Sequence, residues 1–148
     1  MSEIIKSALV PHDHEDMLSL VNHIEAYPEF LQWCKEGFVQ HRFEGGYEAG
    51  MLIKIKGIQV EFITRNEIHK EADLIRMDMA LVSGPFKSLK GEWRFRQFPQ
   101  MGSKVELQLR YEIKSQVIGK MFAKGFDQLA SRLVSDFVNR AGEVYADS

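Results

Sequence analysis

Apolar positions near the start of the chain predict one strand and two short helices. Residues 3–10 are rich in apolar and β-branched side chains, so they predict a strand that ends at Pro11. Asp13 stands at the N-cap position of the helix that follows, and Pro28 suits the first turn of a second short helix over residues 29–34. The first helix is predicted by apolar residues at i, i+3, i+4 and i+7, namely Met17, Leu20, Val21 and Ile24.

From residue 37 to residue 114 the apolar period changes to two, which is the period of β-strands. Such alternation leaves one apolar face and one polar face, the pattern of an antiparallel sheet. Short turns, at 45–46 and 99–103 for example, indicate a meander. The residues predicted to face inward are Val39, His41, Phe43, Met51, Ile53, Ile55, Val60, Phe62, Thr64, Ile75, Met77, Met79, Leu81, Leu89, Trp93, Phe95, Val105, Leu107, Leu109, Tyr111 and Ile113.

Residues 116–145 contain no proline and return to helical spacing. A helix of about 30 residues is roughly 45 Å long, enough to cross the concave face of a curved sheet. Gly119 and Gly125 each cost about 1 kcal/mol relative to alanine inside a helix, so they predict a bend or a close approach to another element. The apolar stripe comprises Ile118, Phe122, Leu129, Leu133, Phe137, Ala141 and Val144, broadened by Met121, Phe126, Ala130, Val134 and Val138.

These elements predict an α+β fold in a single domain over residues 1–148. The sheet is expected to have six to seven antiparallel strands and to curve around the long C-terminal helix, with the two short helices after the first strand. This is the helix-grip arrangement, in which sheet and helix can enclose space between them.

Composition and charge narrow the function classes. The chain has 148 residues, of which 45% are apolar and 27% charged, as in ordinary soluble globular proteins. Its net charge of −2 lacks the excess of positive charge that is typical of nucleic-acid-binding proteins, so no DNA partner is expected. A lone cysteine, Cys34, excludes an internal disulfide, and no apolar run is long enough to span a bilayer. With no signal peptide in the first residues, these features predict a cytoplasmic protein that is not integral to a membrane.

The chain carries no recognisable catalytic motif, so we expect a protein that is not an enzyme. The run His12-Asp13-His14-Glu15 has ligand-type side chains, but its place between a strand and a helix favours exposed capping residues over a metal site. No metal site is therefore predicted. Cys34 is interpreted as a small buried residue, since nothing around it indicates a depressed thiol pKa.

Four methionines are predicted on inward faces: Met51, Met77, Met79 and Met121. Flexible, polarizable methionine suits an adaptable cavity, although the same pattern is also typical of plain core packing. His41, Thr64 and Tyr111 are the polar candidates for contacting the headgroup of a hydrophobic ligand. The predicted lining comprises Phe30, Trp33, His41, Met51, Ile53, Ile55, Met77, Met79, Leu81, Phe86, Trp93, Phe95, Tyr111, Met121, Phe122 and Leu129.

Basic residues gather at outward positions of the predicted strands, interleaved with glutamates. They form either a solvated sheet face or a surface that contacts RNA phosphate or an anionic membrane. The residues predicted for such a contact are Lys87, Lys90, Arg94 and Arg96. The wider basic set comprises Lys54, Lys56, Lys87, Lys90, Arg94, Arg96, Arg110 and Lys114.

Three segments carry a family resemblance: YPEFLQWC (27–34), GPFKSLKGEWRF (84–95) and FVNRAGEVY (137–145). In this order they resemble the coenzyme Q-binding START-domain family of the polyketide cyclase and lipid-transport superfamily. That family includes the bacterial ribosome association toxin proteins. The resemblance covers nearly the whole chain and implies a START/Bet v 1-like helix-grip fold.

The resemblance implies two functions that remain open at this point. The first is binding of ubiquinone or a similar prenyl lipid in support of respiratory electron transport, with no other cofactor and a place at the inner membrane surface. The alternative is binding to the large ribosomal subunit, which blocks subunit joining. An aromatase or cyclase needs an acid or base inside the cavity, and inward titratable residues are few here.

Overall fold

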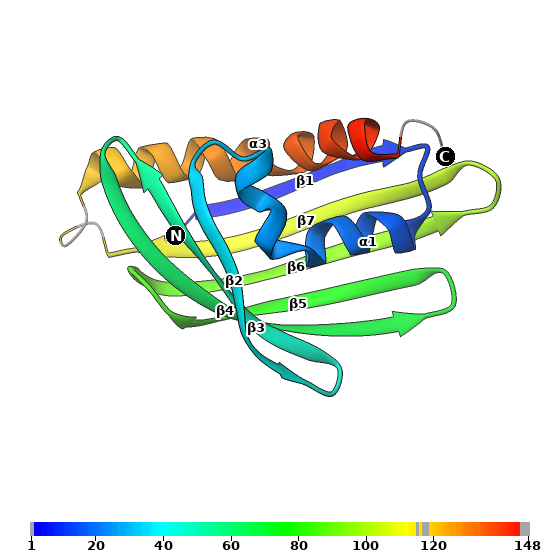
Figure 1. The fold of residues 1–148 in the computed structure, drawn as a ribbon, viewed down its shortest axis with the longest axis horizontal. Coiled ribbons are helices and arrows are strands. Elements are labelled where there is room, and N and C mark those ends of the chain that lie inside the picture. Colours follow the sequence, from blue (N-terminus) through cyan, green and yellow to red (C-terminus); the bar gives the residue numbers. More distant parts are fainter. Residues whose placement is uncertain (1, 115, 117–118, 146–148) are drawn as a thin grey trace.

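The computed structural model describes residues 2–114, 116 and 119–145 of the chain. A strand and two short helices come first, a run of strands follows, and one long helix ends the fold (Figure 1). The elements are β1 (Ser2–Val10), α1 (His14–Asn22), η1 (Ile24–Glu29), β2 (Cys34–Phe43), β3 (Gly46–Ile55), β4 (Ile58–Glu71), β5 (Leu74–Ser83), β6 (Phe86–Phe98), β7 (Gly102–Ile113) and α3 (Lys120–Val144).

The strands form one antiparallel sheet in the order β1-β7-β6-β5-β4-β3-β2. The meander from β2 to β7 is the predicted one, and β1 joins it beside β7. The tight β3–β4 turn uses Lys56 and Gly57, both at positive φ (53° and 82°), the backbone that matches the twist of a hairpin. The predicted helix-grip fold is confirmed, with a curved sheet and a long helix across it (Figure 1).

Helix α3 places one apolar stripe against the inner face of the sheet. The stripe repeats at helical spacing while the strands alternate, so both surfaces present apolar side chains to the same space. Within the described ranges, no helix combines the length and apolar character needed to cross a bilayer. The buried residues of α3 are Phe122, Gly125, Phe126, Leu129, Ala130, Val134, Phe137 and Ala141.

A tyrosine hydrogen bond holds each end of α3. Tyr111 on β7 donates its hydroxyl to the carboxylate of Asp127, near the start of the helix. Tyr145, directly after the helix, donates to the backbone carbonyl of Asp16 on α1 at 3.0 Å. Burial raises the pKa of Tyr111, so this hydroxyl stays protonated and remains a donor. The helix is therefore tied to β7 at one end and to α1 at the other.

The second short helix lies earlier than predicted. Pro28 sits inside the 3-10 helix η1, and residues 29–34 do not form the expected helix. Leu31 closes the turn by donating its N–H to the Tyr27 carbonyl at 2.9 Å. Cys34 then begins β2, because it pairs with Ile53 across the sheet. Strand pairing with β3 prevails over the local helical signal of the proline.

Residue 116, where the C-terminal helix was predicted to begin, is helical, but α3 itself begins at Lys120. Gly119 precedes the helix with φ of 103°, a backbone conformation that glycine adopts without steric cost. Ile118, predicted on the apolar stripe, lies outside the described residues. Gly125 was expected to allow either a bend or a close approach to another element. A Cβ built at Gly125 would lie 2.3 Å from Cγ2 of Ile55. The glycine thus permits close approach of α3 to β3.

Replacing Gly125 with alanine is expected to destabilise the protein by about 1 kcal/mol, measured by urea unfolding. The new methyl group overlaps a branched, stiff side chain, and overpacking costs about 1–3 kcal/mol against a helix-propensity gain of about 1 kcal/mol. Gly142→Ala on the same helix is the matched control, because nothing lies within 4 Å of its Cβ position. That variant should gain up to about 1 kcal/mol. Equal stabilisation by both substitutions would contradict the close approach.

Cys34 is buried at the start of β2, with its thiol near the Glu36 carbonyl oxygen at 3.5 Å. Burial raises the pKa of Cys34 from 9.0 to about 11. The folded state therefore holds the thiol proton more tightly than the unfolded chain does. The resulting contribution to the free energy of unfolding is intact below about pH 9 and is lost as the pH rises toward 11.

The native thiol is expected to react with a disulfide reagent at pH 8 about 100-fold more slowly than the same thiol in urea. Both the low thiolate fraction and the burial of Cys34 slow the native reaction. The reagent releases a coloured thiolate when it reacts, and the rise in absorbance of that thiolate gives the two rates. Similar rates in the native and the unfolded chain would show that the thiol is exposed or its pKa ordinary.

Candidate functional site

An apolar cavity lies between α3 and the inner face of the sheet, and its volume is about 90 Å³. Its walls come from the inner faces of β3 to β7, from the middle of α3, and from Ile24, Tyr27 and Trp33. Pockets that hold drug-sized ligands have volumes of roughly 300–1,000 Å³. The cavity in this conformation is therefore several times smaller than a prenyl quinone requires.

Part of the predicted lining faces this cavity. The strand members lie at alternating positions of neighbouring strands, so their side chains share the inner face of the sheet. The predicted residues that line the cavity are Trp33, Met51, Met77, Met79, Trp93 and Leu129.

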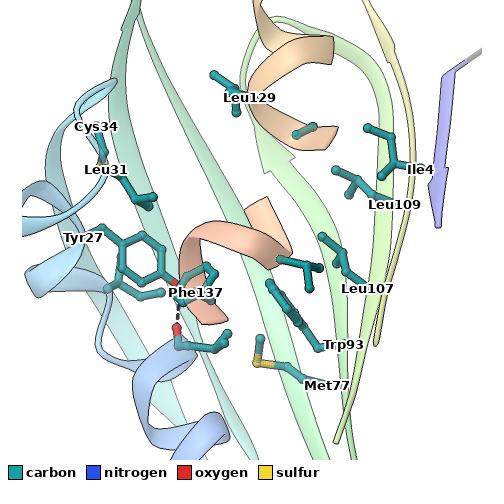
Figure 2. Close-up of a cluster of buried hydrophobic side chains, with 14 of the residues drawn as sticks. Ile4, Tyr27, Leu31, Cys34, Met77, Trp93, Leu107, Leu109, Leu129 and Phe137 are labelled. Atoms are coloured by element: carbon teal, nitrogen blue, oxygen red, sulfur yellow. Dashed lines mark hydrogen bonds between the residues drawn. The ribbon is translucent and has the colours of Figure 1, made fainter. Parts of the chain in front are cut away.

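Aromatic rings pack around Phe137 where η1 meets α3. The ring centroid of Phe137 lies 5.3 Å from that of Tyr27, 5.4 Å from Phe30 and 5.5 Å from Trp93, all at steep angles. Figure 2 shows Tyr27 and Trp93 on either side of Phe137. The Tyr27 hydroxyl donates to the backbone carbonyl of Val21, which fixes the ring. Phe30, a predicted lining residue, lies on the edge of this packed cluster, beyond the cavity wall.

A second aromatic cluster packs around Phe126 of α3. The centroid of Phe126 lies 5.2 Å from that of Phe86 and 5.0 Å from that of Tyr111. Phe62 also meets Phe86, with centroids 5.5 Å apart. Phe62 and Phe126 line the cavity, whereas Phe86 and Tyr111 pack behind them. Edge-to-face packing of this kind makes them part of the core.

The other predicted residues that are at least partly buried also belong to the core. Phe95 stacks on Trp93 with centroids 5.9 Å apart, and Phe122 stacks on Phe126 at 6.4 Å. The sequence pattern identified the inner face but could not separate a ring that lines the cavity from one that packs behind it. The remaining predicted members of this core group are Ile53, Ile55 and Leu81.

One polar pair interrupts the apolar lining. Thr64 and Asn66 follow each other on the inner face of β4, and the Thr64 hydroxyl donates to Asn66 Oδ1 at 2.9 Å. Both residues line the cavity and are buried. Tyr47 lies next to Asn66 and donates its hydroxyl to Asn22 Oδ1 at 2.6 Å. Burial raises the pKa of Tyr47, so the hydroxyl remains a donor.

Asn66 was not predicted as a site residue, although the strand period offers a signal for it. It lies two positions beyond Thr64 and four beyond Phe62, in phase with both. A buried amide needs hydrogen-bond partners, and the carboxamide carries two N–H donors besides the oxygen that Thr64 uses. Asn66 therefore brings hydrogen-bond donors to the wall of an otherwise apolar cavity.

The prediction that His41 lines the cavity is wrong. A bulge between Val39 and His41 shifts the register of β2, so that Val39 pairs with buried Ala49 whereas His41 pairs with outward Glu48. A one-residue shift moves a side chain to the opposite face of a sheet. His41 is exposed as a result, with its ring 5.9 Å from that of Phe43.

The prediction that Met121 lines the cavity is also wrong, because the side chain is 66% exposed. Met121 lies five residues before Phe126, which is buried on the inward stripe. At about 100° per residue the two point about 140° apart around the helix axis. Apolar character alone placed Met121 on the stripe, whereas its angle around the helix places it on the outer surface.

The predicted contact residues lie on the outer face of the sheet, where acids neutralise part of the charge. Lys87 lies 3.9 Å from Glu112, and Arg94 lies 3.0 Å from Glu92. Exposed pairs of this kind contribute little to stability, but they do reduce the local positive field. The predicted residues that lack an acidic partner within 4.0 Å among the described residues are Lys90 and Arg96.

Residues 12–15 act as a junction between β1 and α1. Asp13 occupies the predicted N-cap position, but its carboxylate accepts a hydrogen bond from Gln97 Nε2 at 3.2 Å instead of capping the helix. Glu15 pairs with Lys70 at 3.0 Å. In the part of the chain that the structure describes, no group of three ligand-type side chains could hold a metal ion.

Comparisons with known proteins place this chain in a family. Residues 10–138 match the family model described as polyketide cyclase / dehydrase and lipid transport. A Vibrio cholerae protein named ribosome association toxin RatA is 37% identical over 147 residues, which cover 99% of this chain and 100% of the relative. The mitochondrial coenzyme Q-binding protein coq10 of Schizosaccharomyces pombe is 24% identical over 138 residues, covering 91% of this chain and 84% of the relative.

Solved structures share the fold. A protein from Thermus thermophilus superposes with a TM-score of 0.79 at 20% identity, covering 99% of this chain and 100% of that chain. Human STARD10 superposes with a TM-score of 0.76 at 11% identity, covering 93% of this chain and 62% of that chain. The family match spans most of the chain, and the fold agrees with it. The chain therefore belongs to the polyketide cyclase / dehydrase and lipid transport family.

Proposed function

We propose that the chain is a non-enzymatic binding protein that associates with the large ribosomal subunit and hinders subunit joining. The observation that carries the proposal is the cavity of only about 90 Å³, which leaves the outer surface as the place for a macromolecular partner. Similarity over the full length of a relative named for ribosome association supports it. The described lining residues include no carboxylate, histidine or cysteine, which supports a binding role over acid–base catalysis.

The outer face of β6 and β7 offers a surface for RNA phosphate. Arg96 stands opposite Lys104, and Lys90 stands opposite Arg110, as direct cross-strand neighbours. Like charges directly opposite each other destabilise a sheet unless a counter-charge offsets them. Arg110 has Glu3 at 3.3 Å as its counter-charge. Phosphate would offset the charge that remains, and it would bind to a rigid sheet.

Adding the protein to separated ribosomal subunits is expected to increase the free-subunit peaks in sucrose gradients. The variant Lys90→Glu/Arg96→Glu should require at least about tenfold more protein for the same effect, since a charge-assisted contact contributes about 1.5–3 kcal/mol. Lys6→Glu/Lys35→Glu carries the same charge change at exposed positions elsewhere and should behave like the unmodified protein. Unaffected subunit joining at excess protein would refute the proposal.

A second candidate function is binding of a prenyl quinone in the cavity. The specific observation in its favour is the Thr64–Asn66 pair, because a quinone oxygen accepts hydrogen bonds such as the Asn66 amide donates. The name of the Schizosaccharomyces pombe relative agrees with this chemistry. Binding requires the cavity to expand, and the flexible side chains of Met51, Met77 and Met79 on its wall can change rotamer. Each buried methylene of an isoprenoid tail contributes about 0.8 kcal/mol.

Titration with a short-chain ubiquinone is expected to quench the fluorescence of Trp33 and Trp93, which line the cavity. Asn66→Leu should weaken quinone binding by about tenfold, because one hydrogen bond to the ligand is lost. The same variant should bind the isoprenoid hydrocarbon without its quinone ring as the unmodified protein does. If the unmodified protein neither binds the quinone nor carries lipid detectable by mass spectrometry after purification, the cavity is structural only.

A further inference from the structure

A hollow with a volume of about 580 Å³ lies on the outer face of the sheet. It extends over β4, β5, β6 and β7, which are neighbours in the sheet (Figure 1). Sites that hold small ligands have volumes of roughly 300–1,000 Å³. The outer face therefore offers room for a small molecule, whereas the inner cavity of about 90 Å³ does not.

The hollow is open because one short side chain lies between long ones that turn away from it. Ala80 on β5 pairs with Arg65 on β4 and with Lys90 on β6. The Arg65 guanidinium lies 3.8 Å from the ring centroid of Phe43 on β2, so this side chain extends away from β5. Arg110 on β7 turns the other way, to a carboxylate of the edge strand β1 at 3.3 Å. Ala80 is thus left as an uncovered floor.

Three carboxylates cross the hollow in one row, since Glu67 pairs with Asp78 and Asp78 pairs with Glu92. Like charges directly opposite each other destabilise a sheet unless counter-charges offset them. Arg76 Nε lies 3.6 Å from Asp78 and 3.2 Å from Glu92. Glu67 has no cationic side chain within 4.0 Å among the described residues. Its two carboxylate oxygens are therefore available as acceptors at the β4 side of the hollow.

Lys90 provides the opposite charge at the β6 side. Within the described ranges its ammonium has no acidic partner within 4.0 Å, and Arg110 directly across from it adds to the positive field. Lys90 and Glu67 are separated by two strand spacings, about 10 Å, and by two residues along the strands, about 7 Å. The hollow thus carries an unpaired carboxylate at one end and an unpaired ammonium at the other.

We propose that this hollow binds a guanine nucleotide, with the base over Ala80, its Watson–Crick edge on Glu67 and its phosphate on Lys90. Guanine carries two adjacent donors, N1–H and N2–H, and one carboxylate accepts both in parallel. The phosphate lies at the other end of the nucleotide, where Lys90 donates to it and Arg110 adds positive charge. The inference goes beyond ribosome association and does not rest on it, because a free nucleotide needs no ribosome to bind.

Other ligands match the two ends of the hollow less well. Adenine and cytosine place a ring-nitrogen acceptor beside the amine, and uracil flanks its one N–H with two carbonyl oxygens, so each brings an acceptor against the Glu67 carboxylate. A free amino acid holds its two charges too close together to meet Glu67 and Lys90 at once. An unpaired guanosine of an RNA strand presents the same edge and phosphate as a free nucleotide, so the site recognises the chemistry common to both.

Calorimetric titration of the full chain with GDP, ADP, CDP and UDP tests the proposal. GDP should bind at least about tenfold more tightly than the other three, since two charge-assisted hydrogen bonds distinguish it. Glu67→Gln should remove most of this preference, whereas Glu71→Gln, an exposed position of the same strand outside the hollow, should leave it unchanged. Lys90→Gln should weaken all four nucleotides alike, by at least about fivefold, and reduce the salt dependence.

Ala80→Leu fills the hollow without changing any charge, so it should weaken GDP binding by at least about tenfold. Ala72→Leu, exposed in the β4–β5 turn, is the matched control and should bind like the unmodified protein. Circular dichroism melts of each variant check that the fold is intact.

A short fluorescent RNA with one guanosine among uridines, compared with the all-uridine RNA, distinguishes the two sources of the ligand. Binding of GDP identifies the free nucleotide, and a guanosine preference in RNA alone identifies an unpaired residue of a strand. The absence of a guanine preference in both forms would overturn the proposal. Unchanged binding by Ala80→Leu would overturn it as well, whatever the effect of the protein on subunit joining.

Discussion

The packing of one long helix into the concave face of a curved sheet is the constraint on which the rest of the structure depends. Gly125 brings α3 within van der Waals reach of Ile55, and a Cβ at that position would overlap the Ile55 side chain unless that side chain shifted. Tyr111 and Tyr145 hold the two ends of the helix through hydrogen bonds to distant elements. Because β7 holds the first part of α3, α1 holds its last residues and β3 lies against it at Gly125, only the space left in between is available for a cavity.

That space is mostly filled by aromatic rings. Phe126 contacts three rings from the sheet, and Phe137 contacts the rings of Trp93 on the sheet, Tyr27 on η1 and Phe30 directly after η1. What is left is about 90 Å³ of apolar volume beside the Thr64–Asn66 pair. A buried amide costs about 1–3 kcal/mol when its partners are missing, so Asn66 is an unusual choice for core filling alone. The pair thus places a hydroxyl and an amide group on a cavity wall that is otherwise largely apolar.

The sequence predicted the architecture well because two periods, two for the strands and 3.6 for the helix, are imposed by burial on one face. The prediction of individual inward-facing residues failed at His41 and Met121, where the side chain points away from the face expected from its apolar neighbours. The bulge before His41 turns that side chain outward, and Met121 is apolar but lies at the wrong angle around α3. Asn66 continues the alternation of Phe62 and Thr64 on β4, but a polar side chain adds no hydrophobic signal that would mark it as buried. How far the rings fill the interior depends on packing between distant elements, which no local pattern encodes.

Charge is distributed unevenly over this nearly neutral molecule, and that distribution says more than the net value of −2. On the outer face of the sheet, cations such as Arg94 and Arg110 have acidic partners within 4.0 Å. Lys120 and Lys124 of α3 have none among the described residues, and the exposed Met121 lies in the same turn of the helix. A cation left unpaired beside exposed apolar surface gains nothing for folding, whereas it adds to the attraction for an anionic partner. Because the interior is nearly filled, binding is expected to depend on the surfaces whose cations lack acidic partners.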